Sequence, residues 1–179
     1  MRRFARVLVI LGTVVSLPVV WPTRDGGAAG FHLQERYNPR QALAIVVNKS
    51  NPVDNLPFEE LRKIFLGQRS RWTSGHRIAV VMLERGQPER ETVLREVFRM
   101  SEKDYNRHLL KGLFTGDVFV APKTLSSPVV VRKFVFNAPG AIGYLRASDV
   151  DTSVKVIRVD GLLPPEPDYR LQIDAKGSD

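Results

Sequence analysis

The sequence predicts an α/β protein, in which short strands alternate with helices and the helices flank a sheet. Continuous apolar runs at 42–47 and 78–83 are bounded by polar residues, a pattern typical of buried strands. Segments with the apolar spacing of helices follow each run, and this alternation favours a sheet covered by helices. Of the 179 residues, 43% are hydrophobic and 26% are charged, which supports one folded domain with a sizeable core.

The first strand and the first helix are marked at both ends. Residues 42–47 form the strand, and Asn51-Pro52 turns the chain after it. Residues 56–65 fit a short helix, since Pro57 suits its first turn and Gly67 suits the position after its end. The apolar face of this helix, at i, i+3 and i+4 spacing, consists of Leu61, Ile64 and Phe65.

The second half continues the alternation. We expect strands at 78–83, 141–145 and 154–159, the last nearer an edge because its Val and Ile residues alternate with polar ones. We expect helices from Gly86-Gln87-Pro88 through Met100, from Ser101 through about residue 113, and from Ser127-Pro128 through Phe136. The predicted buried stripe of the first of these consists of Val93, Leu94, Val97 and Phe98.

The N-terminus is typical of an exported protein. Residues 1–30 have the layout of a Sec-type signal peptide: three early arginines, an apolar run at 7–20, and Ala28-Ala29-Gly30 before a cleavage site. An uncleaved N-terminal anchor is the alternative. We expect a linker at 31–41, the folded domain at 42–160 and an extended C-terminal tail at 161–179. The predicted location is the periplasm or another site outside the cytoplasm.

Charge and composition exclude several function classes. The net charge is +8, and removal of residues 1–30 leaves +5, a field that favours anionic ligands or an anionic membrane face. The basic residues are scattered, so we expect no nucleic-acid partner. No cysteine is present, and the three histidines lack metal-ligand spacing. No catalytic or cofactor motif appears, so we expect a non-enzymatic protein without a metal or cofactor.

Several sequence segments resemble those of a known family. They are Asn48-Lys49-Ser50-Asn51-Pro52-Val53, then residues 56–67, then Trp72 with Gly75, and finally Asn137-Ala138-Pro139-Gly140-Ala141-Ile142-Gly143-Tyr144. In this order they resemble the phosphate-type periplasmic solute-binding proteins of ABC importers, over roughly residues 42–146. The resemblance implies one lobe of a type II periplasmic-binding-protein-like fold, with a mixed sheet flanked by helices.

The chain departs from that family in two ways. Complete members have two lobes that close around the ligand, and this chain is too short for both. The second lobe of the family carries an anion loop of Gly-Ser-Gly-Thr type. The corresponding stretch here is Glu84-Arg85-Gly86-Gln87-Pro88-Glu89-Arg90. We therefore interpret the chain as a short, one-lobed relative.

The candidate ligand-binding residues follow from that stretch. An anion loop aims backbone N–H groups and a helix N-terminus at the ligand, and Gly86 before a helix start suits this. Arg85 and Arg90 would add charge-assisted hydrogen bonds, and Gln87 completes the set. Pro88 removes one donor, however, and nearby glutamates compete with an anion, so a well-capped helix is the alternative.

Two further candidates lie at the end of the first predicted strand. Ser50 and Asn51 match the strand-end turn of the family, although these residue types are also common turn formers. No residue is a catalytic or metal-ligand candidate.

The sequence is compatible with two functions. The chain is expected to bind phosphate or a similar oxyanion weakly, as part of phosphate ABC-type uptake or sensing. The alternative is a non-catalytic envelope interaction module that has lost the anion site. The candidate partners are the oxyanion, ABC transporter membrane components or another envelope protein, and a second copy of the chain.

Overall fold

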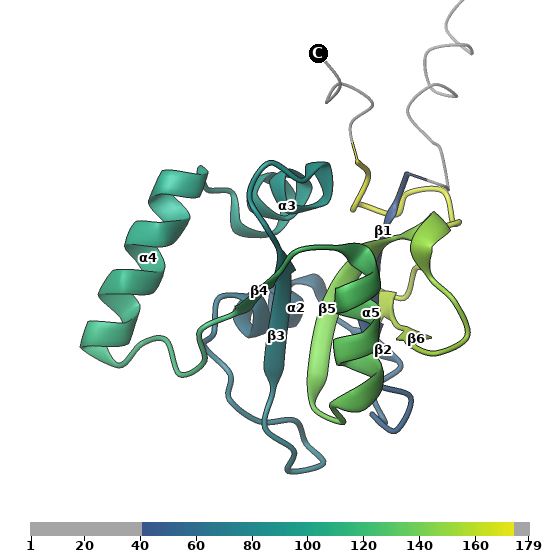
Figure 1. Cartoon of the computed structure of the whole chain (residues 1–179), viewed down its shortest axis with the longest axis horizontal. Coiled ribbons are helices and arrows are strands. Elements are labelled where there is room, and N and C mark those ends of the chain that lie inside the picture. The colour runs from purple at the N-terminus through teal and green to yellow at the C-terminus, as the bar shows by residue number, and fades with distance from the viewer. Residues whose placement is uncertain (1–40, 174–179) are drawn as a thin grey trace, which may run out of the picture.

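A mixed five-stranded sheet forms the centre of the computed structural model, which describes residues 41–173 (Figure 1). The predicted signal peptide, nearly all of the predicted linker and the last six residues of the predicted tail lie outside the described residues. The strand order is β4-β3-β5-β1-β6. The bounds are β1 Leu43–Val47, β3 Ala79–Leu83, β4 Lys123–Leu125, β5 Ala141–Arg146 and β6 Lys155–Val156.

The direction of β1 decides where the candidate residues lie. β3 runs parallel to β4 and β5, whereas β1 is antiparallel to β5 and β6. Ile142 pairs with Val47 on one side and with Val80 on the other. The carboxyl end of β1 and the beginning of β3 therefore lie at the same end of the sheet, with β5 between them. Residues that follow β1 and residues that follow β3 therefore lie at opposite ends of the strands of the sheet.

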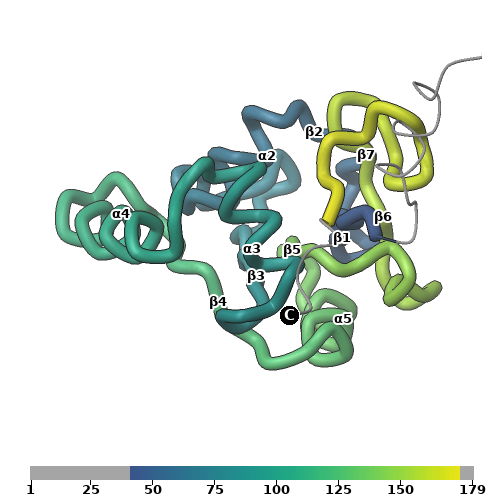
Figure 2. The backbone as a smooth tube through the Cα atoms, turned by 90° about the horizontal axis from the view of Figure 1, so that it is seen from above, coloured from purple at the N-terminus to yellow at the C-terminus, as the bar shows by residue number. Residues whose placement is uncertain are grey.

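Helices cover both faces of the sheet. Figure 2 shows α5 on one face and α2 on the other, with the sheet between them. Phe65 of α2 contacts Phe98 of η1 and Tyr144 of β5, so α2 and η1 share one face of the core. The bounds are α2 Phe58–Phe65, α3 Pro88–Thr92, π-helical η1 Val93–Phe98, α4 Glu102–Thr115, α5 Pro128–Asn137 and the 3₁₀ turn η2 Ala147–Asp149.

The helix starts predicted from local chemistry are confirmed. The Ser101 Oγ accepts a hydrogen bond from the backbone N–H of Asp104 at the start of α4. The Ser127 Oγ accepts one from Val130 at the start of α5, where Pro128 occupies the first turn. Side-chain oxygens thus satisfy N–H groups that a helix leaves unpaired. The predicted stripe Val93, Leu94, Val97 and Phe98 is buried, as are Leu61, Ile64 and Phe65 of α2.

Two short strands, β4 and β2 (Asn55–Leu56), were missed by the sequence analysis, and a third, β7 (Arg158–Val159), was expected as part of a longer strand. β4 is an edge strand of the main sheet, in a stretch to which the sequence analysis assigned no element. β2 pairs in parallel with β7 in a separate two-stranded sheet. The prediction of a single strand at 154–159 is therefore wrong. β6 pairs with β1, whereas β7 belongs to the two-stranded sheet. The buried residue Ile157 lies between them.

The C-terminal segment is packed against the core through residue 173. Tyr169, Leu171 and Ile173 are buried. The Leu43 N–H donates to the Leu171 carbonyl at 2.8 Å, and the Tyr169 hydroxyl donates to the Leu43 carbonyl at 2.8 Å. Although this segment has little regular structure, it covers the beginning of β1. The core thus continues past residue 160, while the division of the whole chain into domains stays a prediction.

The last family phrase, Asn137 to Tyr144, has a structural explanation. Gly140 lies so close to the backbone of Arg77 that a methyl group there would overlap the Arg77 carbonyl. The Gly140 carbonyl accepts a hydrogen bond from the Trp72 indole at 2.9 Å. Trp72 is buried and ties its loop to the start of β5.

Candidate functional site

The structure divides the six candidate residues into two groups. Arg85, Gly86, Gln87 and Arg90 follow β3, at one edge of the sheet. Ser50 and Asn51 follow β1, at the opposite edge, because β1 runs antiparallel to the rest. The two groups do not form one site.

Arg90 lies inside the protein rather than at its surface. Its side chain is only 6% exposed. Its Nη1 donates to the Leu83 carbonyl at 2.8 Å, at the end of β3. Its Nε and Nη2 donate to the two carboxylate oxygens of Glu102, at 2.9 and 2.8 Å. This two-point geometry is the strong form of an arginine–carboxylate pair.

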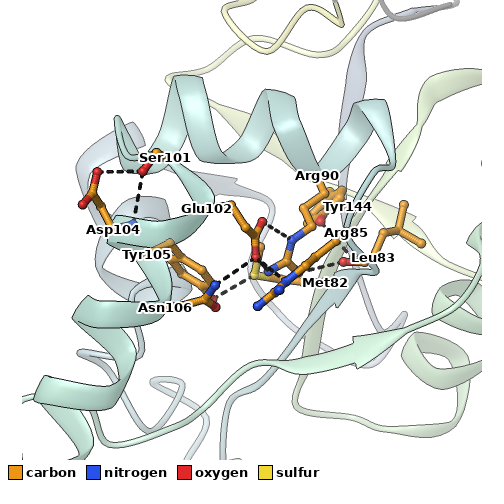
Figure 3. Close-up of polar contacts among 10 residues, drawn as sticks. All are labelled: Met82, Leu83, Arg85, Arg90, Ser101, Glu102, Asp104, Tyr105, Asn106 and Tyr144. Carbon is orange, nitrogen blue, oxygen red and sulfur yellow. Dashed lines mark hydrogen bonds and ion pairs between the residues drawn. The ribbon is translucent and has the colours of Figure 1, made fainter.

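Glu102 joins the two candidate arginines. Its Oε1 also accepts a hydrogen bond from the Nε of Arg85 at 3.1 Å and one from the Asn106 amide at 3.4 Å (Figure 3). We call Arg85, Arg90 and Glu102 the arginine–glutamate cluster. It holds two positive groups around one negative group, so a carboxylate of the chain itself occupies the place between the arginines.

Helix α4 and the ring of Tyr105 hold this arrangement in place. Tyr105 stacks on Phe98 with ring centroids 4.7 Å apart, and the Arg90 guanidinium lies 5.7 Å from the Tyr105 ring centroid. The hydrogen bonds from Arg90 hold the pKa of the Glu102 carboxyl below its ordinary value, and the charges of Arg90 and Arg85 act in the same direction. Glu102 therefore stays ionised at neutral pH.

The loop between β3 and α3 uses its own backbone donors. Gly86 lies in an exposed turn with φ +82°, a left-handed conformation that suits glycine. Gln87 is the N-cap of α3, and its carbonyl accepts the N–H groups of Arg90 and Glu91. Pro88 has no N–H to offer. In this conformation the first turn therefore directs few free donors outward.

Two surface pockets border the arginine–glutamate cluster. One, of about 280 Å³, is lined on one side by Arg85, Gly86 and Glu102 and on the other by Leu94 and Met100. Arg85 and Arg90 also line the second pocket, of about 140 Å³, together with Met82, Tyr105, Asn106, Leu109, Pro122 and Thr124. A small anion in either pocket would reach the arginines beside Glu102.

Ser50 and Asn51 serve a turn in this structure. The Asn48 amide donates to the carbonyls of Val135 and Phe136, so it ties the end of β1 to the end of α5. Ser50 donates through its hydroxyl and its N–H to the Asn48 Oδ1. The Asn51 Oδ1 accepts from the Val53 N–H. Its Nδ2 is buried and makes no hydrogen bond within residues 41–173.

Glu102 is the site residue that the sequence analysis missed. Its helix start was predicted, but only as the beginning of α4. Glu102 meets Arg90 after a turn at Arg99, whose left-handed conformation, φ 55°, ends η1 before α4 begins. A non-glycine residue in that conformation is uncommon, and the sequence carries no sign of it.

Comparison with known proteins identifies the fold. No family model matches the chain. An ABC-type phosphate transport receptor from Vibrio cholerae is 28% identical over 69% of this chain, with a TM-score of 0.56. A putative phosphate ABC transporter substrate-binding protein from Clostridium perfringens, solved with bound phosphate, is 25% identical over 68% of this chain, with a TM-score of 0.55. The chain has a periplasmic-binding-protein-type fold.

The resemblance predicted from the sequence phrases is thereby confirmed. PstS from Borrelia burgdorferi, at 16% identity and a TM-score of 0.51 over 66% of this chain, has the same fold. The chain spans about half the length of these proteins, covering 48%, 46% and 47% of them. The first two are described as a phosphate transport receptor and a putative transporter substrate-binding protein, and this agrees with a solute-binding-like domain.

Two further findings concern the described part of the domain. Within residues 41–173, no group of three or more His, Asp and Glu side chains is arranged to hold a metal ion. None of the helices in that range has the length and apolar composition needed to span a bilayer.

Proposed function

We propose that this chain is an exported, non-enzymatic solute-binding-like protein that takes a phosphate-like oxyanion weakly, in exchange for the carboxylate of Glu102. Arg85 and Arg90 would hold the anion, and Gly86 and Gln87 would line its entrance. The role would lie in phosphate ABC-type uptake or sensing at the cell envelope, with transporter membrane components as partners. The similarity to phosphate transport receptors supports this assignment.

One observation carries the proposal: a carboxylate already lies between two guanidinium groups. Glu102 receives three hydrogen bonds from Arg85 and Arg90, at 2.8 to 3.1 Å. Phosphate offers the same kind of acceptor oxygens in the same planar pairing with arginine. The place is therefore suited to an oxyanion, and an internal one competes for it.

Competition with Glu102 predicts weak binding. An incoming anion must displace Glu102, which stays ionised, and the exposed Glu84 and Glu91 lie close by in the sequence. The lobe formed by residues 41–173 leaves an anion at Arg85 partly open to solvent, because Arg85 itself is exposed. A second copy of the chain, or another envelope protein, would supply the missing wall.

Calorimetric titration of the purified protein with phosphate tests the proposal, with sulfate as the comparison anion. Arg85→Ala should abolish the heat of phosphate binding, because Arg85 is 69% exposed and has the freedom to turn toward a ligand. Arg77→Ala is the matched control, since Arg77 is exposed just before β3, at the opposite edge. Repetition at high protein concentration tests a contribution from a second copy. Absence of saturable heat under all conditions would refute the proposal.

The second candidate is an envelope interaction module without an anion site. The observation that favours it is the same internal ion pair, because Arg90 is buried and all of its nitrogen atoms are engaged within the protein. Under this hypothesis, neither Arg85→Ala nor Arg77→Ala changes the behaviour toward phosphate. Titration of the wild-type protein separates the two functions.

A further inference from the structure

We propose that one face of α4 docks onto an anionic lipid surface. The α4 face consists of Leu110, Leu113 and Phe114 together with Lys103, Arg107 and Lys111. None of these residues takes part in the oxyanion site, so the inference goes beyond the proposed function.

Three large apolar side chains of the α4 face are directed to solvent. Leu110, Leu113 and Phe114 are 61%, 51% and 85% exposed. Their i, i+3 and i+4 spacing places them on one side of the last two helical turns. Another apolar residue, Phe119, is 65% exposed in the following loop. Concentrated apolar exposure of this kind marks an interaction surface.

The position of α4 makes this face accessible. Figures 1 and 2 both show α4 at the side of the domain farthest from α5 and β6. Only Tyr105 and Gly112 of the helix are buried. Gly112 lies against Val118, where a methyl group would overlap the Val118 side chain, so the following loop packs under the helix. The side that bears Phe114 is left uncovered by residues 41–173.

Basic side chains border the apolar ones. Lys103, Arg107 and Lys111 are exposed and follow i, i+4 and i+8 spacing, which aligns them along one side of α4. Asp104 pairs with Arg107 at 3.1 Å, and it is the one carboxylate of the described residues in an ion pair with these three. Glu102, at the same end of the helix, is engaged with Arg85 and Arg90. The face therefore carries a positive charge.

This combination favours a lipid surface over other occupants. A helix that lies in a membrane interface has Leu and Phe on one side and Lys or Arg beside them, as α4 does. Anionic headgroups attract basic residues close to the surface. A second copy using the same face would bring two basic rows together, and like charges across an interface oppose association. The charge of +5 on residues 31–179 acts in the same direction.

Sedimentation with lipid vesicles tests the docking directly. We expect the full chain to bind vesicles that contain phosphatidylglycerol more strongly than vesicles of phosphatidylcholine alone, and to be released partly by salt. Leu110→Ser/Phe114→Ser should lower the partition constant by at least about tenfold, because two exposed apolar side chains lose their burial in lipid. Lys103→Glu/Lys111→Glu should remove the preference for the anionic vesicles.

A matched control comes from α5. Val129 and Phe136 are 47% and 55% exposed on that helix, so Val129→Ser/Phe136→Ser also removes two exposed apolar side chains. This variant should bind vesicles like the wild type. The apolar run at 7–20 is common to all the variants, so differences between them cannot arise from it.

A second readout locates the contact. Because the chain has no cysteine, Leu113→Cys provides a single site for an environment-sensitive dye, and Val130→Cys provides its control on α5. Anionic vesicles should shift the emission of the dye at position 113 to shorter wavelength, with little change at 130. Three results would overturn the proposal: equal shifts at the two positions, an unchanged partition for the α4 variants, or dimerisation through α4 without vesicle binding. Capture of a protein partner by α4 in the absence of lipid binding would also overturn it.

Discussion

Arg90 and Glu102 form a two-point ion pair at the edge of the sheet where β3 ends. The Nη2–Oε1 distance is 2.8 Å and the Nε–Oε2 distance is 2.9 Å. Arg90 is almost fully buried and Glu102 is partly exposed. The pair links α3 to α4 and occupies the place where the proposed oxyanion would lie, so it bears on both stability and binding.

Removal of Arg90 should destabilise the protein strongly. Arg90→Ala leaves Glu102 without its main partner and the Leu83 carbonyl without a donor. Loss of one partner of a buried pair costs about 3 kcal/mol in the free energy of unfolding. Urea unfolding monitored by circular dichroism measures this change.

Arg85 provides the comparison for Arg90. The Arg85 side chain, which pairs with the same carboxylate, is 69% exposed. Arg85→Ala should therefore lower the free energy of unfolding by less than about 1 kcal/mol. Equal losses for the two variants would contradict the structural role assigned to Arg90. Since Arg90→Met/Glu102→Leu removes both charges, it should recover part of the stability lost in Arg90→Ala.

Stability should fall in acid because of Glu102. The folded state lowers the pKa of this carboxyl from its ordinary value near 4.5, chiefly through the hydrogen bond from Arg90. A lowered folded-state pKa gives stability that is present above about pH 4.5 and is lost as the pH falls through the folded-state value. Unfolding free energies measured between pH 7 and pH 3 should show this decrease.

Glu102→Gln separates this contribution from that of other carboxyl groups. The difference in unfolding free energy between the wild type and Glu102→Gln should be greatest near pH 7 and should shrink below pH 4.5. Glu60, whose pKa is lowered mainly by Lys63, contributes in the same window and serves as a comparison through Glu60→Gln. A constant difference for Glu102→Gln at all pH values would be inconsistent with the pair.

The C-terminal segment should be necessary for stability. Leu171 is fully buried and its carbonyl accepts the N–H of Leu43 in β1. Leu171→Ala should lower the free energy of unfolding by about 3 kcal/mol, the usual cost of a cavity in a core. Arg170→Ala, a change at an exposed neighbour, should have a much smaller effect. Similar stability of the Leu171→Ala variant and the wild type would show that residues 162–173 do not belong to the core.

The parts of the fold predicted from the sequence depend on local chemistry. α2 was predicted because its apolar face and the glycine after it are both readable within ten residues. The helix starts at Ser101 and Ser127 were predicted for the same reason, since the capping side chain lies within a few residues of the helix. β4 was missed because its three residues lack an apolar run: Lys123 and Thr124 are exposed. β2 and β7 are two-residue strands that exist only through their mutual pairing.

The site was less predictable than the fold, for a geometric reason. Sequence reasoning placed Arg85 and Arg90 at the end of a strand, and the structure has both there. It could not place Glu102 between them, because that contact depends on the turn at Arg99 between η1 and α4. Nor could it separate Ser50 and Asn51 from the arginines, since the separation requires knowledge that β1 is antiparallel to β5.

The affinity of phosphate for the wild type and for Glu102→Gln is the most direct test of the account. Glutamine keeps the shape of Glu102 but removes the competing charge. We predict that Glu102→Gln binds phosphate at least about tenfold more tightly than the wild type, a difference of about 1.4 kcal/mol. Equal affinity, or no binding by either protein, would contradict the proposal that Glu102 occupies an oxyanion site.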